Sequence, residues 1–252
     1  MVFIKTVPLN SKESQEYDIW RMLDRPEARL HPDNHTVPVR EVLYFNPNFA
    51  LAGVEPELTD ARLFVVMERF DKVTPLDGPS SYPGYPFIRT VEDLCRLFLQ
   101  IAQAVRYMHD LGIAHQDLRD KNFLIDRAST VDRCYVIDFQ FSLYFPRPWA
   151  AVPKVLIDAD APEASQPTKP YNPFPVDVFG VGSIFGKMIR AHQLAGWTSL
   201  AELSGIAGSM CQWDPELRPT IHAVQNYLED LIQISKSPME LKHPDRRLTS
   251  AD

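Results

Sequence analysis

The pattern of apolar and polar residues is most regular after Thr90. Apolar residues recur there at steps of three and four, the period of an amphipathic helix, at Leu94, Leu97, Phe98, Ile101, Val105 and Met108. Thr90 and Asp93 offer a capping box at the start, and Gly112 is typical of a helix end. We therefore expect a long helix whose apolar stripe packs in the core.

Other helices are predicted on both sides of this one. In the N-terminal part, Ser11 and Ser14 offer a cap, an apolar stripe follows, and Pro26 is expected to end the helix. In the C-terminal part, helices are predicted over residues 176–189, 200–210 and 221–234. The C-terminal part should be mostly helical.

Strands are predicted over residues 2–5, 36–45 and 63–67, all before the long helix. Residues 63–67 are too apolar for a solvated edge, so this strand should lie deep in a sheet. Residues 30–34 read as a turn. The N-terminal part is thus a small sheet with one helix.

Residues 71–90 have the composition of a connector, with prolines at 75, 79, 83 and 86. We place the boundary between the two parts there. The polar tail 235–252 is expected to be disordered.

Composition narrows the class of protein. The chain has 252 residues, 45% hydrophobic and 23% charged, with a net charge of -7, which argues against binding nucleic acid or an anionic membrane. No apolar run approaches the roughly 20 residues of a membrane span, and the opening residues are too few for a signal peptide, so we expect a cytoplasmic or nuclear protein. Cys95, Cys134 and Cys211 form no CxxC pair and are expected to be free thiols.

Residues 113–125 carry the strongest chemical signal. They place His115, Asp117 and Asn122 between two short apolar runs, and Asp138 follows at the end of a predicted strand. A carboxylate can accept a hydroxyl proton, and amide and carboxylate oxygens suit Mg²⁺. This combination indicates phosphoryl transfer.

These two segments resemble the eukaryotic protein kinase family. That family has a catalytic loop His-Arg-Asp-x-x-x-x-Asn and a metal loop Asp-Phe-Gly. Here the loops read His-Gln-Asp-Leu-Arg-Asp-Lys-Asn and Asp-Phe-Gln. Residues 33–36 and 170–173 also resemble a loosely defined group of fungal kinase-like proteins.

Distal residues extend the resemblance over nearly the whole chain. Ala161-Pro162-Glu163 is similar to the end of the family's activation segment, and Asp177 begins a segment similar to its Asp-x-Trp-x-x-Gly helix, with Phe for Trp. The resemblance implies that Glu163 pairs with Arg218 and that Asp177 braces the catalytic loop. Glycines 180, 182 and 186 superficially match a nucleotide-binding loop, but no strand precedes them, so they indicate helix packing.

The resemblance implies a catalytic set in the loop. Asp117 would be the base, and Asn122 and Asp138 would hold Mg²⁺. Arg119 or Lys121 would neutralise charge on the transferred phosphate, and the presence of both leaves the choice between them open.

The resemblance also implies an ATP site in the N-terminal part. Lys5 would bind the α- and β-phosphates and pair with Glu16, with Glu13 as second choice. The hinge after the strand 63–67 would meet adenine through Met67, Glu68 and Phe70.

The fold we expect is α+β, a protein-kinase-like two-lobe fold. Residues 1–70 would be a partial N-lobe with a truncated sheet, 71–90 the hinge or connector, and 91–234 the helical C-lobe. The implied function is transfer of the γ-phosphate of ATP to a hydroxyl of a protein substrate, serine or threonine rather than tyrosine. The sequence leaves the oligomeric state open.

Two alternatives stay open at this point. The first is a pseudokinase that acts as a binding or scaffolding module, which is favoured by Phe3 in place of a small residue near adenine and by Gln140 in place of the metal-loop Gly. Only four residues precede Lys5, so the Gly-rich phosphate loop is missing here: either the chain is a fragment of a longer one or the protein works without this loop. The second is a small-molecule kinase, which residues 161–163 and Arg218 disfavour. Gln116 replaces the family's Arg, so activation by loop phosphorylation is not expected.

Overall fold

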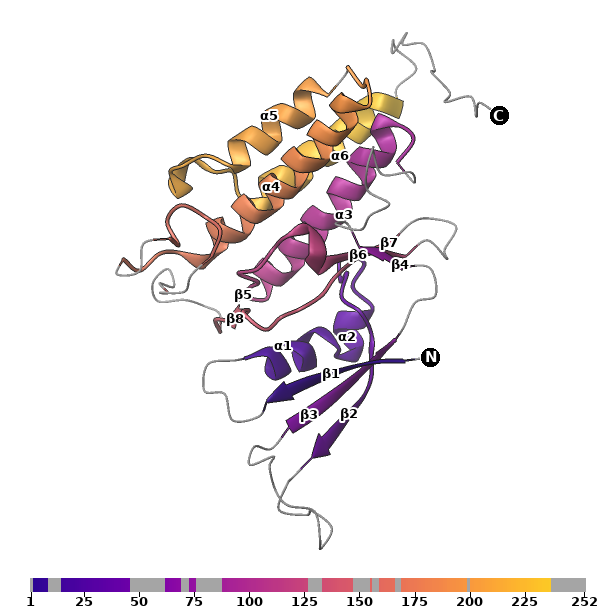
Figure 1. Ribbon diagram of the computed structural model, residues 1–252, viewed down its shortest axis with the longest axis vertical. Coiled ribbons are helices and arrows are strands. Elements are labelled where there is room, and N and C mark those ends of the chain that lie inside the picture. The colour runs from indigo at the N-terminus through magenta and orange to yellow at the C-terminus, as the bar shows by residue number, and fades with distance from the viewer. Residues whose placement is uncertain are drawn as a thin grey trace, which may run out of the picture.

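The computed structural model describes residues 2–8, 15–45, 62–68, 73–75, 88–126, 133–146, 155, 159–165, 169–198 and 200–236. Its architecture is the expected α+β mixture, with a sheet-containing N-terminal part on one side of a helical C-terminal part (Figure 1). One cluster of buried apolar side chains runs through both parts, from Val7 and Ile19 to Val224 and Ile232.

The N-terminal sheet consists of β1 (Val2–Pro8), β2 (Val39–Phe45) and β3 (Arg62–Glu68), antiparallel in the order β1-β3-β2. The central strand is the one predicted to lie deep, and its Val65 is fully buried. The strand predicted from residue 36 begins only at Val39, because Thr36 instead bridges Val136 of the C-terminal part.

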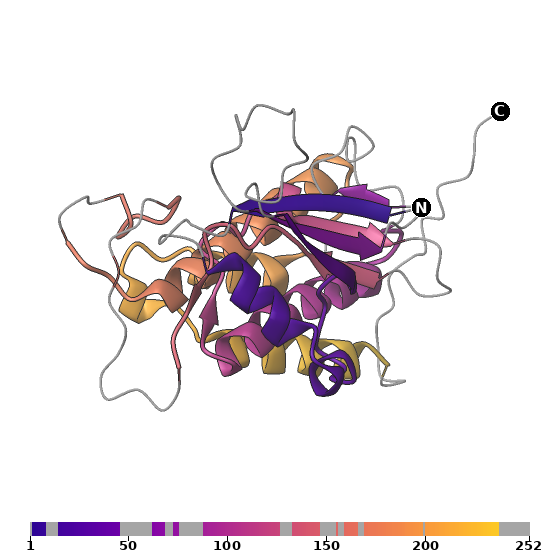
Figure 2. The same ribbon diagram turned by 90° about the horizontal axis from the view of Figure 1, so that it is seen from below.

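Two helices lie together on one side of this sheet, α1 (Glu16–Leu23) and α2 (Pro26–Arg29), as Figures 1 and 2 show. Helix α1 buries Ile19, Trp20 and Leu23, as the apolar stripe predicted. Pro26 does not simply end a helix: it opens α2, since proline is well tolerated in the first helical turn. Ser11 and Ser14 lie outside the described residues.

Short strands connect the two parts. β4 (Val73–Pro75), β6 (Phe123–Asp126) and β7 (Arg133–Val136) form a sheet in the order β4-β6-β7, and β5 (Ile113–Ala114) pairs with β8 (Leu143–Tyr144). The predicted connector therefore contains one strand, β4, which was not predicted because the prolines of this segment indicated turns. Residues 76–87 and the tail from 237 lie outside the described residues.

The C-terminal part contains α3 (Val91–Asp110), α4 (Pro173–Leu194), α5 (Ala201–Met210) and α6 (Ile221–Lys236). The capping box of α3 is present: Asp93 N–H donates to Thr90 Oγ1 at 3.0 Å, and Thr90 N–H donates to Asp93 Oδ2 at 2.9 Å. Helix α4 begins earlier than predicted because Asn172 caps it and Pro173 suits its first turn. Helix α3 packs on α6, and α4 on α5.

The expectation that the glycines of α4 serve helix packing is confirmed at Gly182, whereas a Cβ at Gly180 would meet Leu118 of the loop and one at Gly186 would meet Arg190 of the same helix. A Cβ at Gly182 would lie 2.6 Å from Met210 Cβ and 2.9 Å from Cys211 Sγ, so α4 and α5 approach closely only because this side chain is absent. The three cysteines are free. Among the described residues, no helix combines the length and the apolar character that crossing a membrane requires.

Candidate active site

The loop between β5 and the 3-10 turn η3 (Asp120–Asn122) is held in place by hydrogen bonds to α4. The Asp177 carboxylate accepts the backbone N–H of His115 at 2.7 Å and that of Gln116 at 2.8 Å, and His109 Nε2 lies 3.0 Å from it. Asp177 is buried, so these bonds form in a poorly solvated setting where they are strong. The expected brace is confirmed.

Gln116 turns inward at the position where the family has Arg. Its φ is 66°, its Nε2 donates to the Pro173 carbonyl at 2.8 Å, and Tyr171 donates its hydroxyl to Gln116 Oε1 at 3.1 Å. Both ends of the amide are thus hydrogen-bonded within the protein. Gln116 fastens the loop to the start of α4.

Asp117 is buried, and each of its carboxylate oxygens has a partner. Asn122 Nδ2 donates to Oδ2 at 2.8 Å and to the Asp117 carbonyl at 2.7 Å, and Arg119 Nη2 lies 2.5 Å from Oδ1. The Asn122 amide nitrogen is used in these bonds. Its oxygen, which is the atom a metal needs, is not.

His115 ties this loop to the segment that carries Asp138. Its Nε2 donates to the Ile137 carbonyl at 3.1 Å, and Asp117 N–H donates to its Nδ1 at 3.3 Å. Burial lowers the pKa of His115 and outweighs the nearby carboxylates, which raise it. The ring is therefore neutral, with its proton on Nε2.

Lys5 brings three distant segments together. Its Nζ lies 2.5 Å from Glu16 Oε1 on α1 and 2.7 Å from Asp138 Oδ1. The predicted partnership with Glu16 is present, whereas Glu13 lies outside the described residues. Burial alone would lower the pKa of Lys5, but the hydrogen bonds to Asp138 and Glu16 outweigh it and the pKa is raised.

Asp138 lies beyond the strand in which it was predicted. β7 ends at Val136, and Asp138 has a φ of 68°, so the backbone turns sharply there. The Ile137 N–H donates to the Asn122 carbonyl at 3.0 Å, which sets Asp138 beside Asn122. Burial would raise the pKa of Asp138, but the hydrogen bond and charge of Lys5 lower it overall.

The positive φ falls on Asp138, not on the position of the family's Gly. Among the described residues other than glycine, only Gln116 and Asp138 have positive φ. Gln140 therefore adopts an ordinary backbone conformation. It does not strain this loop.

The predicted adenine contacts are described only in part. Met67 is buried in β3 with Phe3 opposite it on β1, and Glu68 pairs with Arg40 at 3.1 Å. Phe3 is 56% exposed. Arg69 and Phe70 lie outside the described residues.

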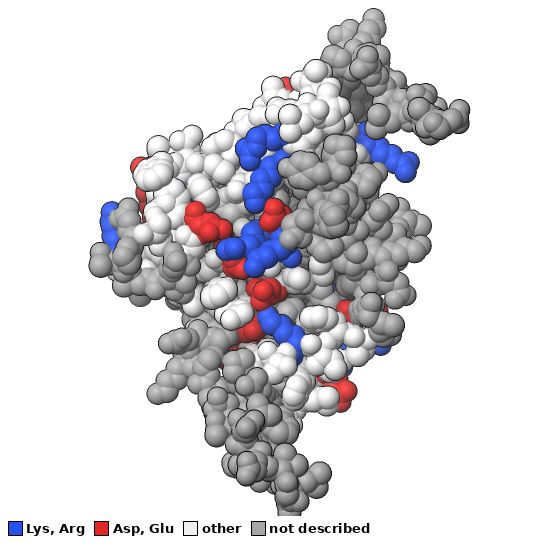
Figure 3. Space-filling view, viewed as in Figure 1, with Lys and Arg blue, Asp and Glu red and all other residues white. Residues whose placement is uncertain are grey.

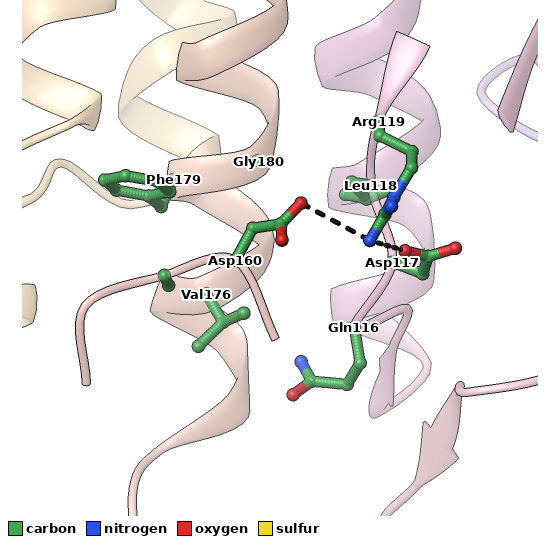
Figure 4. Close-up of a pocket in the computed structure, with 9 residues that line it drawn as sticks. Gln116, Asp117, Leu118, Arg119, Asp160, Val176, Phe179 and Gly180 are labelled. Carbon is green, nitrogen blue, oxygen red and sulfur yellow. Dashed lines mark ion pairs between the residues drawn. The ribbon is translucent and has the colours of Figure 1, made fainter. Parts of the chain in front are cut away.

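Arg119 links the loop to the segment before α4. Its Nη2 contacts Asp117 Oδ1 at 2.5 Å and Asp160 Oδ2 at 3.3 Å, across a small pocket (Figure 4). Lys121, the other candidate cation, is exposed in η3. Sequence reasoning missed Asp160; its only signal was an acid directly before residues 161–163.

Arg218 and Glu163 form the predicted ion pair. The guanidinium is bidentate on the carboxylate, at 2.6 and 2.8 Å, and also donates to the carbonyls of Gln212, Pro175 and Trp213. Phe179, which replaces the family's Trp, lies under the guanidinium at 4.9 Å. The pair holds the segment before α4 against the turn before α6.

Acidic and basic side chains are interleaved down the middle of the face in Figure 3. The donors of the site suit a hard cation: Asn122 offers an amide oxygen and Asp138 a carboxylate, both oxygen ligands. No group of three or more His, Cys, Asp or Glu that could hold a metal occurs in the described part of the chain. Asn122 and Asp138 are the residues that would hold a magnesium ion.

Comparison with known proteins agrees with this geometry. Residues 58–197 match the family described as protein kinase domain. A probable CTD kinase subunit alpha homolog of Encephalitozoon cuniculi is 31% identical over 133 residues, covering 48% of this chain and 39% of that protein. The serine/threonine-protein kinase PTK2 of Candida glabrata is 30% identical over 157 residues, 55% of this chain and 18% of that protein.

A more distant relative is the stress-activated protein kinase jnk-1 of Caenorhabditis elegans, 26% identical over 168 residues, 61% of this chain and 33% of that protein. The chain thus spans well under half the length of these three relatives. The family match covers more than half of the chain itself, from 58 to 197. The chain belongs to the protein kinase family.

Proposed function

We propose that this chain transfers the γ-phosphate of ATP to a hydroxyl of a protein substrate, serine or threonine in preference to tyrosine. The observation that carries the proposal is the position of Lys5, which contacts both Glu16 and Asp138. The contact supports the proposal because it brings the residue proposed to bind phosphate next to the carboxylate proposed to bind the metal. The named relatives include serine/threonine kinases, which supports the choice of hydroxyl.

The proposal gives a role to each predicted site residue of the loop and to Asp138. Asp117 accepts the proton of the attacking hydroxyl, and Asn122 and Arg119 hold its carboxylate in place. Arg119 also neutralises charge on the transferred phosphate, with Lys121 as the alternative. Asn122 and Asp138 hold Mg²⁺, which would neutralise charge on the phosphates when bound.

The N-terminal part would position the nucleotide. Lys5 binds the α- and β-phosphates and Glu16 keeps it oriented. Met67 and Glu68 would border the adenine, with Met67 on the buried side, and Phe70, the third predicted contact, lies outside the described residues. His115 takes no part in proton transfer, because both of its nitrogens are already used inside the protein.

Asp117→Asn tests the proposal. Removing the base should lower the rate of phosphate transfer to a mixed protein substrate by about 10²- to 10⁴-fold. The matched control is Asp230→Asn. Asp230 is exposed on α6 and lies far from the site along the chain, so this variant should transfer phosphate at the wild-type rate. Undiminished transfer by Asp117→Asn would contradict the assignment.

A thermal melt separates ATP binding from transfer. ATP with Mg²⁺ at about a hundredfold over its dissociation constant adds about 2.7 kcal/mol. For a chain of this size the melting temperature should rise by about 5 to 10 °C. The rise should persist in Asp117→Asn and disappear in Asp138→Ala.

A second candidate is a kinase-like binding module without transfer. The large side chain of Phe3 lies opposite Met67, where adenine would bind, and Asp138 Oδ1 is already engaged by Lys5. Absence of any magnesium-dependent rise in the melting temperature would favour this second function. A rise without transfer would favour a nucleotide-binding module.

A further inference from the structure

A pocket lies directly beside the proposed base, between the catalytic loop and α4 (Figure 4). Its walls are apolar where Ala161, Val176 and Phe179 line it, and acidic where Asp117 and Asp160 do. The enclosed volume is only about 20 Å³, which is room for about one water. In this conformation the pocket admits a side chain only if Arg119 moves aside.

Asp160 is the most accessible polar group of this pocket. Its side chain is 78% exposed, and Arg119 Nη2 contacts it at 3.3 Å while lying closer to Asp117, at 2.5 Å. Because one nitrogen reaches both acids, the two carboxylates are near neighbours. Asp160 therefore offers a weakly held negative charge within reach of the proposed base.

Arg119 itself indicates which chemistry the pocket accepts. A guanidinium on an apolar stem now lies between the two acids (Figure 4). Its Nε is buried and has no hydrogen-bond partner within the described part of the chain. A buried donor without an acceptor is costly, so a rearrangement that supplies one is favourable.

We propose that Asp160 selects substrates carrying Lys or Arg next to the accepting hydroxyl. This inference rests on the proposed function. Adjacent residues of an extended peptide are about 3.8 Å apart, so a neighbour of the acceptor at Asp117 can reach Asp160. The stem of that neighbour packs against Val176 and Phe179 and its cation replaces Arg119 on Asp160. Arg119 then becomes available to the transferred phosphate.

The test uses the full chain and a set of peptides with one serine. The residue on either side of the serine is Arg, Leu or Glu. Affinity is measured by fluorescence anisotropy, and transfer by kcat/KM. An Arg neighbour should be preferred to Leu about three- to five-fold, as for an exposed ion pair, and the preference should shrink at high salt.

Two variants and a control sharpen the result. Asp160→Asn should abolish the preference, and Asp160→Lys should reverse it toward Glu. Asp230→Asn removes the same charge from α6, which lines no part of the pocket, and should leave the preference unchanged. A preference that survives in Asp160→Asn overturns the inference.

The outcomes separate the inference from the function. If the wild-type chain binds all peptides with equal affinity and transfers phosphate to all of them, or if it binds no peptide at all, the role of Asp160 is overturned. Binding that prefers Arg in wild type and not in Asp160→Asn, without any transfer, supports the role of Asp160 and overturns the proposed function.

Discussion

Lys5 shows how one side chain can depend on both parts of the chain. Glu16, one of its partners, is almost fully buried at 3% side-chain exposure, so its charge needs a cation. Asp138, the other partner, comes from the C-terminal part. Removing Lys5 would leave one buried acid and one half-buried acid facing each other, which is unfavourable.

Lys5→Met tests this dependence. The variant should lose about 2 kcal/mol of unfolding free energy, the cost of breaking charged hydrogen bonds in a partly buried site. The matched control is Lys187→Met, which breaks an exposed pair with Asp120 and should cost about 0.5 kcal/mol or less. Denaturant unfolding at neutral pH measures both. Equal losses would show that the Lys5 contacts do not stabilise the protein.

The pH dependence of this contribution follows from the two pKa shifts. The pKa of Asp138 lies below 3.8. Its contribution to the free energy of unfolding is therefore present above about pH 4 and is lost as pH falls through the lowered pKa. The pKa of Lys5 lies above 10.5, so its share is present below that pH and is lost as pH rises through the raised value. The difference in unfolding free energy between wild type and Lys5→Met should be largest between these two pH limits.

The sequence predicted some of these contacts and not others. Lys5 with Glu16 could be predicted, because the helix spacing and the family resemblance placed both residues. The left-handed backbone at Asp138 could not, since carboxylates give no pattern that marks positive φ. Nor could the contact of Arg119 with Asp160, because no sequence pattern links these two charged residues, which lie far apart along the chain.

Helix α4 supports the catalytic loop by direct contact with its backbone. A Cβ at Gly180 would lie 2.6 Å from the Leu118 carbonyl oxygen and 3.1 Å from Leu118 Cβ. Backbone cannot move aside as the tip of a flexible side chain can. The loop that carries Asp117 therefore rests on a helix position where only glycine fits.

Gly180→Ala should both destabilise the protein and impair the site. Overpacking of this kind costs about 1 to 3 kcal/mol, and the displaced Leu118 adjoins Asp117. The control is Gly205→Ala inside α5, where nothing lies within 4 Å of the new Cβ. This variant should gain about 0.5 to 1 kcal/mol from helix propensity. Thermal melts and transfer assays compare the two, and a stabilised Gly180→Ala would contradict the close approach.

At the level of elements, periodicity predicted the helices well. The stripe and the capping box placed α3, and the apolar runs placed α5 and α6. Two of the errors occurred at prolines: Pro26 opens a short helix, and β4 lies inside a proline-rich segment. Proline restricts φ but does not by itself say whether an element ends or begins there.

The two parts of the molecule are joined by residues 34–36 as well as by the connector. Val136 N–H donates to the His35 carbonyl at 2.8 Å, and His35 Nδ1 donates to the Cys134 carbonyl at 3.0 Å. Periodicity predicted the α+β class and the order of the parts. It could not predict this junction, because its residues are polar, buried and aperiodic.

Buried neutral histidines should make the whole molecule less stable in mild acid. Burial lowers the pKa of His35 and of His115, so the unfolded chain binds protons that the folded chain does not. The contribution of these histidines to the free energy of unfolding is then fully present above about pH 6.5. Below that pH the free energy of unfolding falls by at most about 1.4 kcal/mol per pH unit for each histidine. Urea unfolding from pH 7.5 to 5.5 measures the slope.

His35→Gln removes one of these titrations and should make the slope shallower. Urea unfolding of this variant at pH 8, where both histidines are neutral in either state, checks that it folds. A slope equal to that of wild type would show that His35 does not contribute.

The contact between Lys5 and Asp138 joins residues 133 positions apart, which bears on the order in which the chain folds during synthesis. Lys5 therefore leaves the ribosome 133 residues before its second partner, Asp138. Long-range contacts of this kind form slowly, because a large loop must close first. The sheet and α1 can collapse early, but the site is completed only when the segment after β7 arrives. Until that segment arrives, Lys5 of the nascent N-terminal part can contact Glu16 but lacks its contact with Asp138.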